Sequence, residues 1–233
     1  MTFDGTVDAA APAATANPRL VRVAQLIAQH LQGGAVLDVG CWTGGLARIL
    51  TDHVPCSYTG IDVEPAAQAI EAARRAVPEQ RFLVVPSVES LPFEAESFDV
   101  VVLTEVIEHV PVGREGPVLA ELARVLRPGG SIIFSTPYHN LLNLLDPAWF
   151  FGHRHYSVEA VARLARSNGL CMTDIRFSGG IWTALDTNLL YVYKHVLHRL
   201  YRGYAWLQRR ADRESRPTVR GALATTLWCR LVR

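Results

Sequence analysis

Residues 35–46 read Ala35-Val36-Leu37-Asp38-Val39-Gly40-Cys41-Trp42-Thr43-Gly44-Gly45-Leu46. The short apolar run predicts a buried strand over 35–39, the glycines predict a tight turn, and the apolar spacing after Gly45 predicts a helix. Glycines let a ligand approach the backbone closely, and the start of a helix directs N–H groups and a positive dipole end at it. The stretch therefore predicts a ligand site just beyond the first strand.

A second carboxylate follows about twenty residues later, at the spacing seen in nucleotide-binding folds. The run Tyr58-Thr59-Gly60-Ile61-Asp62 predicts a strand that ends in an acid. A carboxylate at that place can accept hydrogen bonds from both hydroxyls of a ribose. The first half of the chain thus predicts a nucleoside site. A dinucleotide-binding dehydrogenase is the alternative, since the same carboxylate selects NAD, but the loop lacks the full Gly-x-Gly-x-x-Gly spacing.

Strand and helix patterns alternate through most of the chain. Strands are predicted at 35–39, 57–62, 81–85, 98–103, 131–136, 170–177 and 225–232, and helices at 44–53, 65–76, 115–126 and 157–167. This order predicts an α/β fold whose sheet is mostly parallel, with helices on both faces. Ligands in such sheets bind beyond the carboxyl ends of the strands. We therefore expect Gly40, Asp62, Ser87, Thr104 and Thr136 to face one pocket.

Two segments fall outside this alternation. Residues 1–17 lack hydrophobic periodicity and predict a disordered tail, so the predicted domain covers 18–233, with a first helix from Pro18. Residues 178–220 predict a helical insertion between the sixth and seventh strands, with an apolar helical stripe over 189–207.

Composition narrows the choice of partner and compartment. The chain has 233 residues and a net charge of +1, so no broad basic field favours nucleic acid, although 194–220 is locally basic. Four cysteines are scattered without metal or redox spacing, which indicates a reducing cytoplasm. We find no signal-peptide pattern and no apolar run of the ~20 residues that span a bilayer. The chain is expected to be cytoplasmic, as a monomer or a homodimer.

Seven short motifs follow one another in a fixed order. They are Val36–Cys41, Gly60–Asp62, Glu89–Phe93, Ser97–Val101, Glu105–Val110, Val125–Gly130 and Ser135–Pro137. Over residues 34–177 the chain therefore resembles the class I S-adenosylmethionine-dependent methyltransferases. Within them it resembles most the ubiquinone-biosynthesis O-methyltransferase branch, which has a methyltransferase type 11 domain. The resemblance implies a Rossmann-like sheet of seven strands with an antiparallel last strand, and S-adenosyl-L-methionine as the cofactor.

The resemblance also assigns residues to the cofactor. The expected set is Asp38, Gly40, Cys41, Trp42, Gly44, Asp62, Val63, Ser87, Val88, Thr104 and Glu105. Asp62 is expected on the ribose, and Asp38 is expected to orient the turn and reach the methionine amino group through water. The sequence departs from the family at two positions. Trp42 replaces the middle glycine of the loop, and Ser87 stands where an aspartate often lies, so Ser87 or the Val88 backbone would meet adenine.

The segment after the fourth strand carries two acids and a histidine. If a helix begins at Thr104, then Glu105, Glu108 and His109 share one of its faces. Such a set, completed by His155, could bind Mg²⁺ or Mn²⁺, and a Glu-x-x-Glu-His pattern accompanies a metal in the ubiquinone and small-RNA 2′-O-methyltransferases that the chain resembles. The alternative is that the acids position the cofactor or the substrate loop without a metal.

These residues predict methyl transfer to a small-molecule or lipid-linked acceptor, with a hydroxyl oxygen as the nucleophile. The expected catalytic residues are Glu105, Glu108, His109, His153 and His155, with a histidine as the base. The aromatic and arginine-rich segment 181–220 is expected to form a lid or substrate wall, and could contact a membrane surface or a lipophilic substrate. An RNA methyltransferase and an inactive protein that binds the cofactor or S-adenosylhomocysteine are the alternatives.

Overall fold

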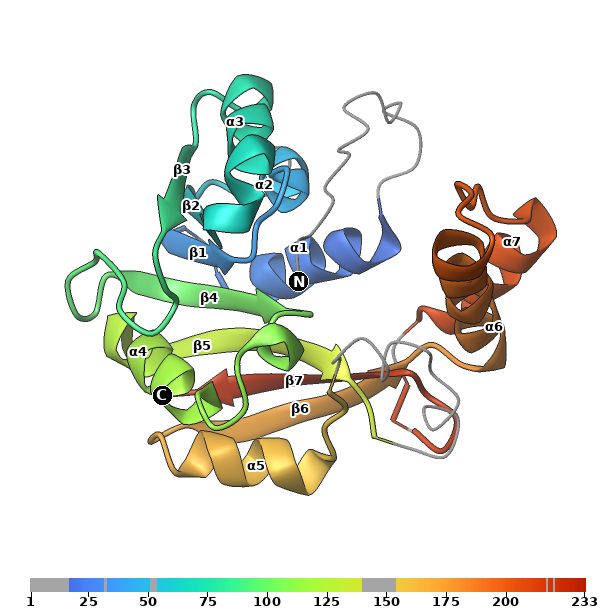
Figure 1. Cartoon of the computed structure of the whole chain (residues 1–233). Coiled ribbons are helices and arrows are strands. Elements are labelled where there is room, and N and C mark those ends of the chain that lie inside the picture. The colour runs from blue at the N-terminus through green and yellow to red at the C-terminus, as the bar shows by residue number, and fades with distance from the viewer. Residues whose placement is uncertain (1–16, 32, 51–53, 140–153, 217, 220) are drawn as a thin grey trace. The chain divides into compact units, whose positions relative to one another are not determined.

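The computed structural model describes residues 17–31, 33–50, 54–139, 154–216, 218–219 and 221–233 (Figure 1). Residues 1–16 of the tail expected over residues 1–17, and the candidate base His153, lie outside the described residues. Asn17, the last residue of the expected tail, is described and caps the first helix. The expected division into a tail and one domain with an insertion stays a prediction.

Seven strands form one sheet, as the sequence predicts. They are β1 Ala35–Val39, β2 Ser57–Val63, β3 Arg81–Val85, β4 Phe98–Thr104, β5 Leu126–Pro137, β6 Cys171–Ser178 and β7 Thr226–Val232. Their order in the sheet is β3-β2-β1-β4-β5-β7-β6. β1 runs parallel to β2 and β4, and β2 runs parallel to β3, whereas β7 is antiparallel between β5 and β6. The Rossmann-like fold with an antiparallel last strand is therefore confirmed.

The helices alternate with these strands. They are α1 Pro18–His30, α2 Gly45–Leu50, α3 Ala67–Ala76, α4 Glu115–Val125, α5 Val158–Arg166, α6 Ile181–Tyr191 and α7 Ala205–Glu214. Short turns of 3₁₀-helix cover Glu64–Ala66 and Ile107–His109, and a π-helical turn, Val192–Val196, continues α6. Among the described residues, no helix is long and apolar enough to cross a bilayer.

The chain packs as two compact units, each described by itself. The first comprises the described residues of 17–104, 116–133 and 232–233, and the second comprises the described residues of 105–115 and 134–231. In the first unit the strands bury apolar side chains: Val36, Leu37, Ile61, Val101 and Leu103 have no exposed surface. Such continuous burial is expected of parallel strands covered on both faces. Figure 1 shows α3 beside β3. Asn17 caps α1, which begins at Pro18.

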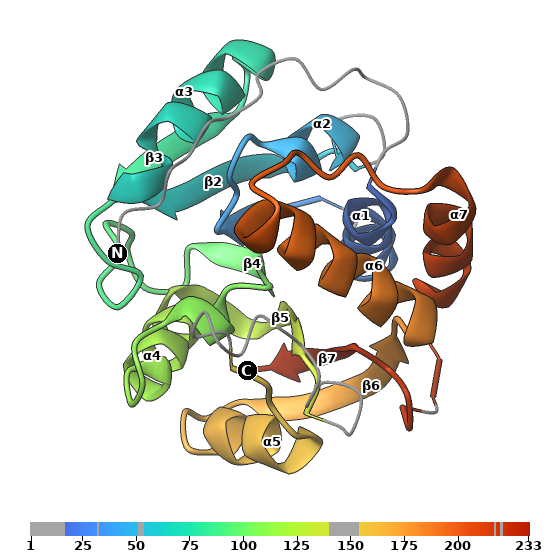
Figure 2. The same cartoon turned by 45° about the vertical axis from the view of Figure 1, so that its right-hand side comes forward.

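The second unit contains a helical hairpin and a helix with defined ends. Ser157 caps α5 by accepting a hydrogen bond from the Ala160 N–H at 3.2 Å, and Gly169 follows the helix in the left-handed region at φ 73°. In both Figure 1 and Figure 2, α6 and α7 lie side by side. Both helices fall inside the segment 178–220, where the sequence predicts helices.

Two local predictions are wrong. The strand expected at 131–136 begins earlier, at Leu126, where the Gly129 N–H donates to Arg233 O and the Arg233 N–H donates to Gly130 O. The expected continuous stripe over 189–207 is broken, because the chain leaves the helical conformation after Val196 and places His198 at φ 50° and Gly203 at φ 72°. Apolar spacing alone revealed neither the early start of β5 nor the break in the helix.

One carboxylate fixes the start of the central strand. Asp99 of β4 accepts hydrogen bonds from the Ala35 N–H at 2.8 Å and from Arg127 Nη1 at 2.5 Å. We expect Asp99→Ala to lower the free energy of unfolding by about 1–3 kcal/mol, because the Ala35 N–H loses its acceptor and Arg127 loses its carboxylate partner. Urea denaturation measures the change.

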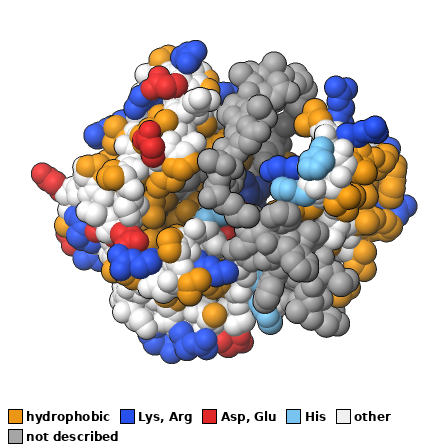
Figure 3. All heavy atoms as spheres, viewed as in Figure 1, with side chains coloured by type: hydrophobic (Ala, Val, Ile, Leu, Met, Phe, Trp, Pro, Cys, Tyr) orange, Lys and Arg blue, Asp and Glu red, His pale blue; other side chains and the backbone are white. Residues whose placement is uncertain are grey.

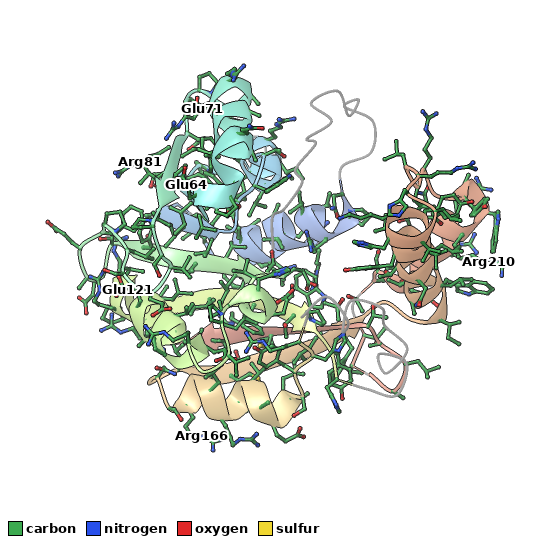
Figure 4. All side chains as sticks on the ribbon, in the orientation of Figure 1. Glu64, Glu71, Arg81, Glu121, Arg166 and Arg210 are labelled. Atoms are coloured by element: carbon green, nitrogen blue, oxygen red, sulfur yellow. The ribbon has the colours of Figure 1, made fainter. Side chains whose placement is uncertain are left out.

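Glu71→Ala is the matched control, because Glu71 also pairs with an arginine, Arg74, but on the exposed face of α3 (Figure 4). We expect its effect to stay within about 0.5 kcal/mol. Equal losses for the two variants would contradict the anchoring role of Asp99.

Candidate functional site

The loop after β1 is tied to the end of β2 by backbone hydrogen bonds. The N–H groups of Gly40 and Cys41 both donate to Ile61 O, at 2.8 and 3.1 Å. Gly40 and Gly44 have φ values of 76° and 70°, in the left-handed region that glycine adopts without steric cost. The two glycines therefore shape a loop that leads directly into α2, as the sequence predicts.

The glycine of the Gly60-Ile61-Asp62 run has a packing function. A Cβ atom at Gly60 would lie 2.8 Å from Cys41 Sγ and 2.8 Å from Phe82 Cδ1. The side chain of Cys41 thus lies against the backbone of β2, and burial raises the pKa of its thiol. The Cys41 thiol therefore packs against β2. The backbone N–H groups of the loop are the part of this segment that a ligand could contact.

Trp42 occupies the position where the resembling enzymes commonly have glycine. Its φ of 48° is left-handed, a conformation that costs a non-glycine residue about 1–2 kcal/mol. The side chain is 44 % exposed, and the Trp42 N–H donates to Asp62 Oδ2 at 3.0 Å. The loop therefore keeps its glycine-like backbone despite the large side chain.

Asp62 is oriented by two backbone donors. Oδ2 accepts from Trp42, and Oδ1 accepts from the Val63 N–H at 2.8 Å. Burial raises the pKa of this half-buried carboxyl group, while the two hydrogen bonds oppose the rise. Each carboxylate oxygen has a further lone pair, so the group can still accept from two adjacent hydroxyls.

Asp38 is the buried acid of the site. It is 6 % exposed and accepts a hydrogen bond from the Tyr58 hydroxyl at 2.5 Å. Burial raises its pKa to about 7, with the negative charge of Asp62 adding to the rise and the Tyr58 hydrogen bond and the charge of Arg19 opposing it. The carboxyl group therefore titrates near neutral pH, unlike an ordinary surface aspartate.

Two arginines of α1 were missed by the sequence analysis. The Nε atoms of Arg19 and Arg22 are buried and have no hydrogen-bond partner among the described residues, and Arg19 is close enough to Asp38 to influence its charge. A buried guanidinium nitrogen without an acceptor is costly, so a ligand carboxylate fits this place. The only sequence signal was a pair of basic residues three apart at the start of the first predicted helix.

Ser87 and Val88 follow β3 at the same strand edge as Asp62, because Val85 is paired with Val63 in the register of β2 and β3. The Ser87 hydroxyl accepts from the Glu89 N–H at 3.1 Å, which forms a tight turn, and its own proton stays available for donation. Both residues are half-buried. Their expected contact with adenine stays a prediction.

In the second unit, the acids after β4 do not form the helical face that the sequence analysis expected. Thr104 ends β4, Glu105 has φ 56°, and only Ile107–His109 form a short 3₁₀ turn. The spacing from Glu105 to Glu108 therefore does not align the two side chains on one helical face. The prediction is wrong because a left-handed residue interrupts the path from strand to turn.

Each acid has a hydroxyl partner on β5 instead. Ser135 holds Glu105 twice: its carbonyl oxygen accepts from the Glu105 N–H at 3.0 Å, and its hydroxyl donates to Glu105 Oε1 at 2.8 Å. Glu108 is 2 % exposed and accepts from Thr136 Oγ1 at 3.2 Å. These contacts fix a strained residue and a buried acid, the kind of arrangement that clusters at functional sites.

Arg154 fixes the rest of this turn. Its guanidinium donates to the carbonyl oxygens of Ile107, Glu108 and Val110 and to the carboxylate of Glu115. The neighbouring His155 is half-buried, and His109 is exposed at the end of the turn. This role of Arg154 was not predicted, because only the histidines on either side of it were candidates for the site.

The metal site expected from Glu105, Glu108, His109 and His155 is not supported. Within the part of the chain that the structure describes, no three side chains from histidine, cysteine, aspartate or glutamate are grouped so that they could hold an ion. Glu105 accepts a hydrogen bond from the Ser135 hydroxyl, and Glu108 accepts one from the Thr136 hydroxyl.

Comparison with known proteins agrees with this geometry. A family described as a methyltransferase domain matches residues 37–134. The phthiotriol/phenolphthiotriol dimycocerosates methyltransferase of Mycobacterium leprae is 41 % identical over 107 residues, which cover 46 % of this chain and 38 % of that protein. The sterol 24-C-methyltransferase of Schizosaccharomyces pombe is 37 % identical over 101 residues, which cover 42 % of this chain and 26 % of that protein. The matches span less than half the length of these relatives.

Solved structures share the fold at low identity. An S-adenosylmethionine-dependent methyltransferase from Mesorhizobium loti has a TM-score of 0.62 at 14 % identity, with 91 % of this chain and 96 % of that chain covered. The [4+2]-cyclase SpnF has a TM-score of 0.65 at 18 % identity, with 91 % and 81 % covered. Since one of these neighbours is named a cyclase, the fold alone does not decide the reaction.

The buried acid Asp38 predicts a pH-dependent stability. Its pKa of about 7 lies above the value of about 3.9 in an unfolded chain. Folding therefore favours the protonated form: the contribution is fully present below pH ~4 and is lost as the pH rises through ~7. We expect Asp38→Asn to stabilise the protein relative to wild type at pH 8 and to give a smaller gain, or none, at pH 5.

Urea denaturation of both proteins at the two pH values measures this difference. Asparagine still offers an oxygen to the Tyr58 hydroxyl, so the variant removes the charge and keeps the hydrogen bond. A gain that is the same at both pH values would contradict the raised pKa.

Proposed function

We propose that this chain is an S-adenosylmethionine-dependent methyltransferase that transfers a methyl group to a hydroxyl oxygen of a lipophilic small molecule. The match of residues 37–134 to a methyltransferase domain supports the proposal. The observation that carries the proposal is the carboxylate of Asp62, held by the backbone of the glycine loop at the carboxyl end of β2. Its position and its remaining acceptor capacity match the needs of a ribose.

The donor site would use residues of the first unit. Asp62 would accept the two ribose hydroxyls, and the loop from Gly40 to Gly44 would let the methionine part approach the backbone. Arg19 and Arg22 offer buried donors for the methionine carboxylate, and Asp38 offers an acceptor for the amino group. Ser87 and Val88 would meet adenine. The charges of the buried groups thus complement both ends of an amino acid.

When bound, S-adenosylmethionine supplies a methyl group on a positively charged sulfur that is already a good leaving group. The protein therefore has to align the acceptor oxygen with that methyl group, exclude water and accept the hydroxyl proton. Glu105 follows Thr104 directly at the end of β4, which is paired in the sheet with β1. We propose that Glu105 and Glu108 orient the acceptor hydroxyl and that His109 or His155 accepts its proton.

The acceptor class rests on the named relatives and on one segment of this chain. The relatives are named for a dimycocerosate lipid and for a sterol, both lipophilic acceptors. In this chain, segment 181–220 is rich in exposed apolar side chains, which would favour contact with such a molecule or with a lipid surface.

We further propose a cytoplasmic location, supported by the free thiols of Cys41, Cys56, Cys171 and Cys229.

Titration calorimetry with S-adenosylhomocysteine tests the donor site. We expect Asp62→Ala to weaken binding by about 10- to 100-fold, because a carboxylate hydrogen-bonded to hydroxyls contributes about 1.5–3 kcal/mol. Asp174→Asn, which removes an exposed carboxylate from the second unit, is expected to leave affinity unchanged. Wild-type protein that fails to bind S-adenosylhomocysteine would contradict the proposal.

A transfer assay tests the reaction. The full chain is incubated with isotope-labelled S-adenosylmethionine and long-chain diols, phenols or sterols, and the product is analysed by mass spectrometry. We expect a methyl ether as the product. We expect Glu105→Gln to lower kcat by about 100-fold, because the carboxylate would orient the acceptor hydroxyl in the transition state. The affinity for S-adenosylhomocysteine, measured alongside, separates this role from a contact with the donor. Glu159→Gln on the exposed first turn of α5 is the control.

The outcomes of this assay separate the alternatives. A product methylated at carbon would contradict the choice of oxygen, and methylation of RNA in place of the lipophilic acceptors would contradict the acceptor class. Donor binding without turnover on any acceptor would favour an inactive binding protein.

A further inference from the structure

Exposed apolar side chains concentrate in one short part of the chain. Of the thirteen large hydrophobic side chains that are exposed among the described residues, nine lie between residues 181 and 206. Ile181, Leu185, Val192 and Val196 recur at helical spacing along α6 and its π-helical extension, and we name these four the apolar stripe. Val196 is 68 % exposed. In Figure 3, hydrophobic side chains gather over the α6–α7 region, with Lys, Arg and His side chains at their edge.

The hairpin does not need the apolar stripe for its own packing. Trp182 meets Trp206 edge to face at 6.1 Å between ring centroids, and the guanidinium of Arg210 lies 4.5 Å from the centroid of Trp182 (Figure 4). Glu214 at the end of α7 accepts from the Thr183 N–H at 2.9 Å. The two helices are thus joined by the tryptophan pair and by this cap, which leaves the aliphatic side chains of the stripe for another surface.

The charge of the same segment is strongly unbalanced. Residues 181–220 contain eight Lys and Arg side chains against three Asp and Glu, a net +5 in a chain whose total is +1. Between Ile181 and Tyr193 the sole charged residue is Asp186, and Lys194, Arg199 and Arg202 follow at once. Exposed apolar side chains together with nearby basic ones are the combination by which a peripheral protein binds the surface of an anionic bilayer.

We propose that α6, the π-helical turn and α7 form a docking surface for an anionic lipid bilayer. The apolar stripe enters the boundary between headgroups and acyl chains, and Arg199 and Arg202 contact lipid phosphates. The charge argues against a second copy of the chain as the occupant, because two surfaces of net +5 repel each other. The inference rests on the proposed function, since a lipophilic acceptor is dissolved in such a bilayer.

Flotation of the full chain with vesicles tests the docking surface. We expect binding to vesicles of phosphatidylcholine mixed with phosphatidylglycerol, little binding to phosphatidylcholine alone, and loss of binding as salt is raised. Arg199→Glu combined with Arg202→Glu should weaken binding by about tenfold or more. Leu185→Asp combined with Val196→Asp should weaken it comparably, because the apolar stripe no longer enters the bilayer.

Matched controls come from the same unit. Arg166→Glu reverses an exposed charge on α5, and Leu223→Asp replaces an exposed aliphatic side chain before β7. Neither should change vesicle binding. S-adenosylhomocysteine affinity is measured for every variant, because retained affinity shows that the protein is folded and that the donor site is intact.

Three results would overturn the proposal. The first is wild-type protein that binds S-adenosylhomocysteine and no vesicle, which leaves the proposed function intact. The second is controls that lose vesicle binding as strongly as the hairpin variants. The third is a wild-type dimer that Leu185→Asp combined with Val196→Asp converts to a monomer in sedimentation while vesicle binding stays unchanged. That result would assign the surface to a second copy of the chain.

Discussion

The backbone conformation of the loop after β1 is fixed by hydrogen bonds to two neighbouring residues at the end of β2. Gly40 and Cys41 donate to Ile61 O, and Trp42 donates to the carboxylate of the next residue, Asp62. Three successive N–H groups are therefore satisfied by two neighbouring residues of another strand. This requires the left-handed backbone at Gly40 and the absence of a side chain at Gly60, where the side chain of Cys41 lies. The glycines at positions 40 and 60 follow from these contacts.

The acids of the second unit are constrained in a different way. Glu105 keeps a left-handed conformation that few non-glycine residues adopt, and Ser135 compensates with a backbone and a side-chain contact. Arg154 satisfies three carbonyl oxygens of the turn that follows. This polar network fixes the two carboxylates and the backbone of the turn. It also explains why a short irregular segment between β4 and α4 can carry a precise arrangement of side chains.

Much of the fold and part of the candidate site could be predicted from the sequence. The predictions that were wrong or missing have physical reasons. The strands and the glycine loop were predicted because burial and backbone conformation leave strong local signals, as at Val36–Val39 and Gly44. The helix expected from Thr104 failed because a left-handed residue leaves no signal in residue types. The role of Arg19 was missed because an unpaired nitrogen depends on what surrounds it in space. The break after Val196 was missed because apolar spacing does not register where the chain leaves a helix.

The central claim is that the first unit holds an adenosyl group, with Asp62 on the ribose and the α1 arginines on the amino-acid end. The most direct test is a crystal structure of the chain soaked with S-adenosylhomocysteine. The account predicts both ribose hydroxyls within hydrogen-bonding distance of the Asp62 carboxylate and the ligand carboxylate beside Arg19 or Arg22. A ligand bound elsewhere, or ribose hydroxyls that do not contact the Asp62 carboxylate at saturating ligand, would contradict it.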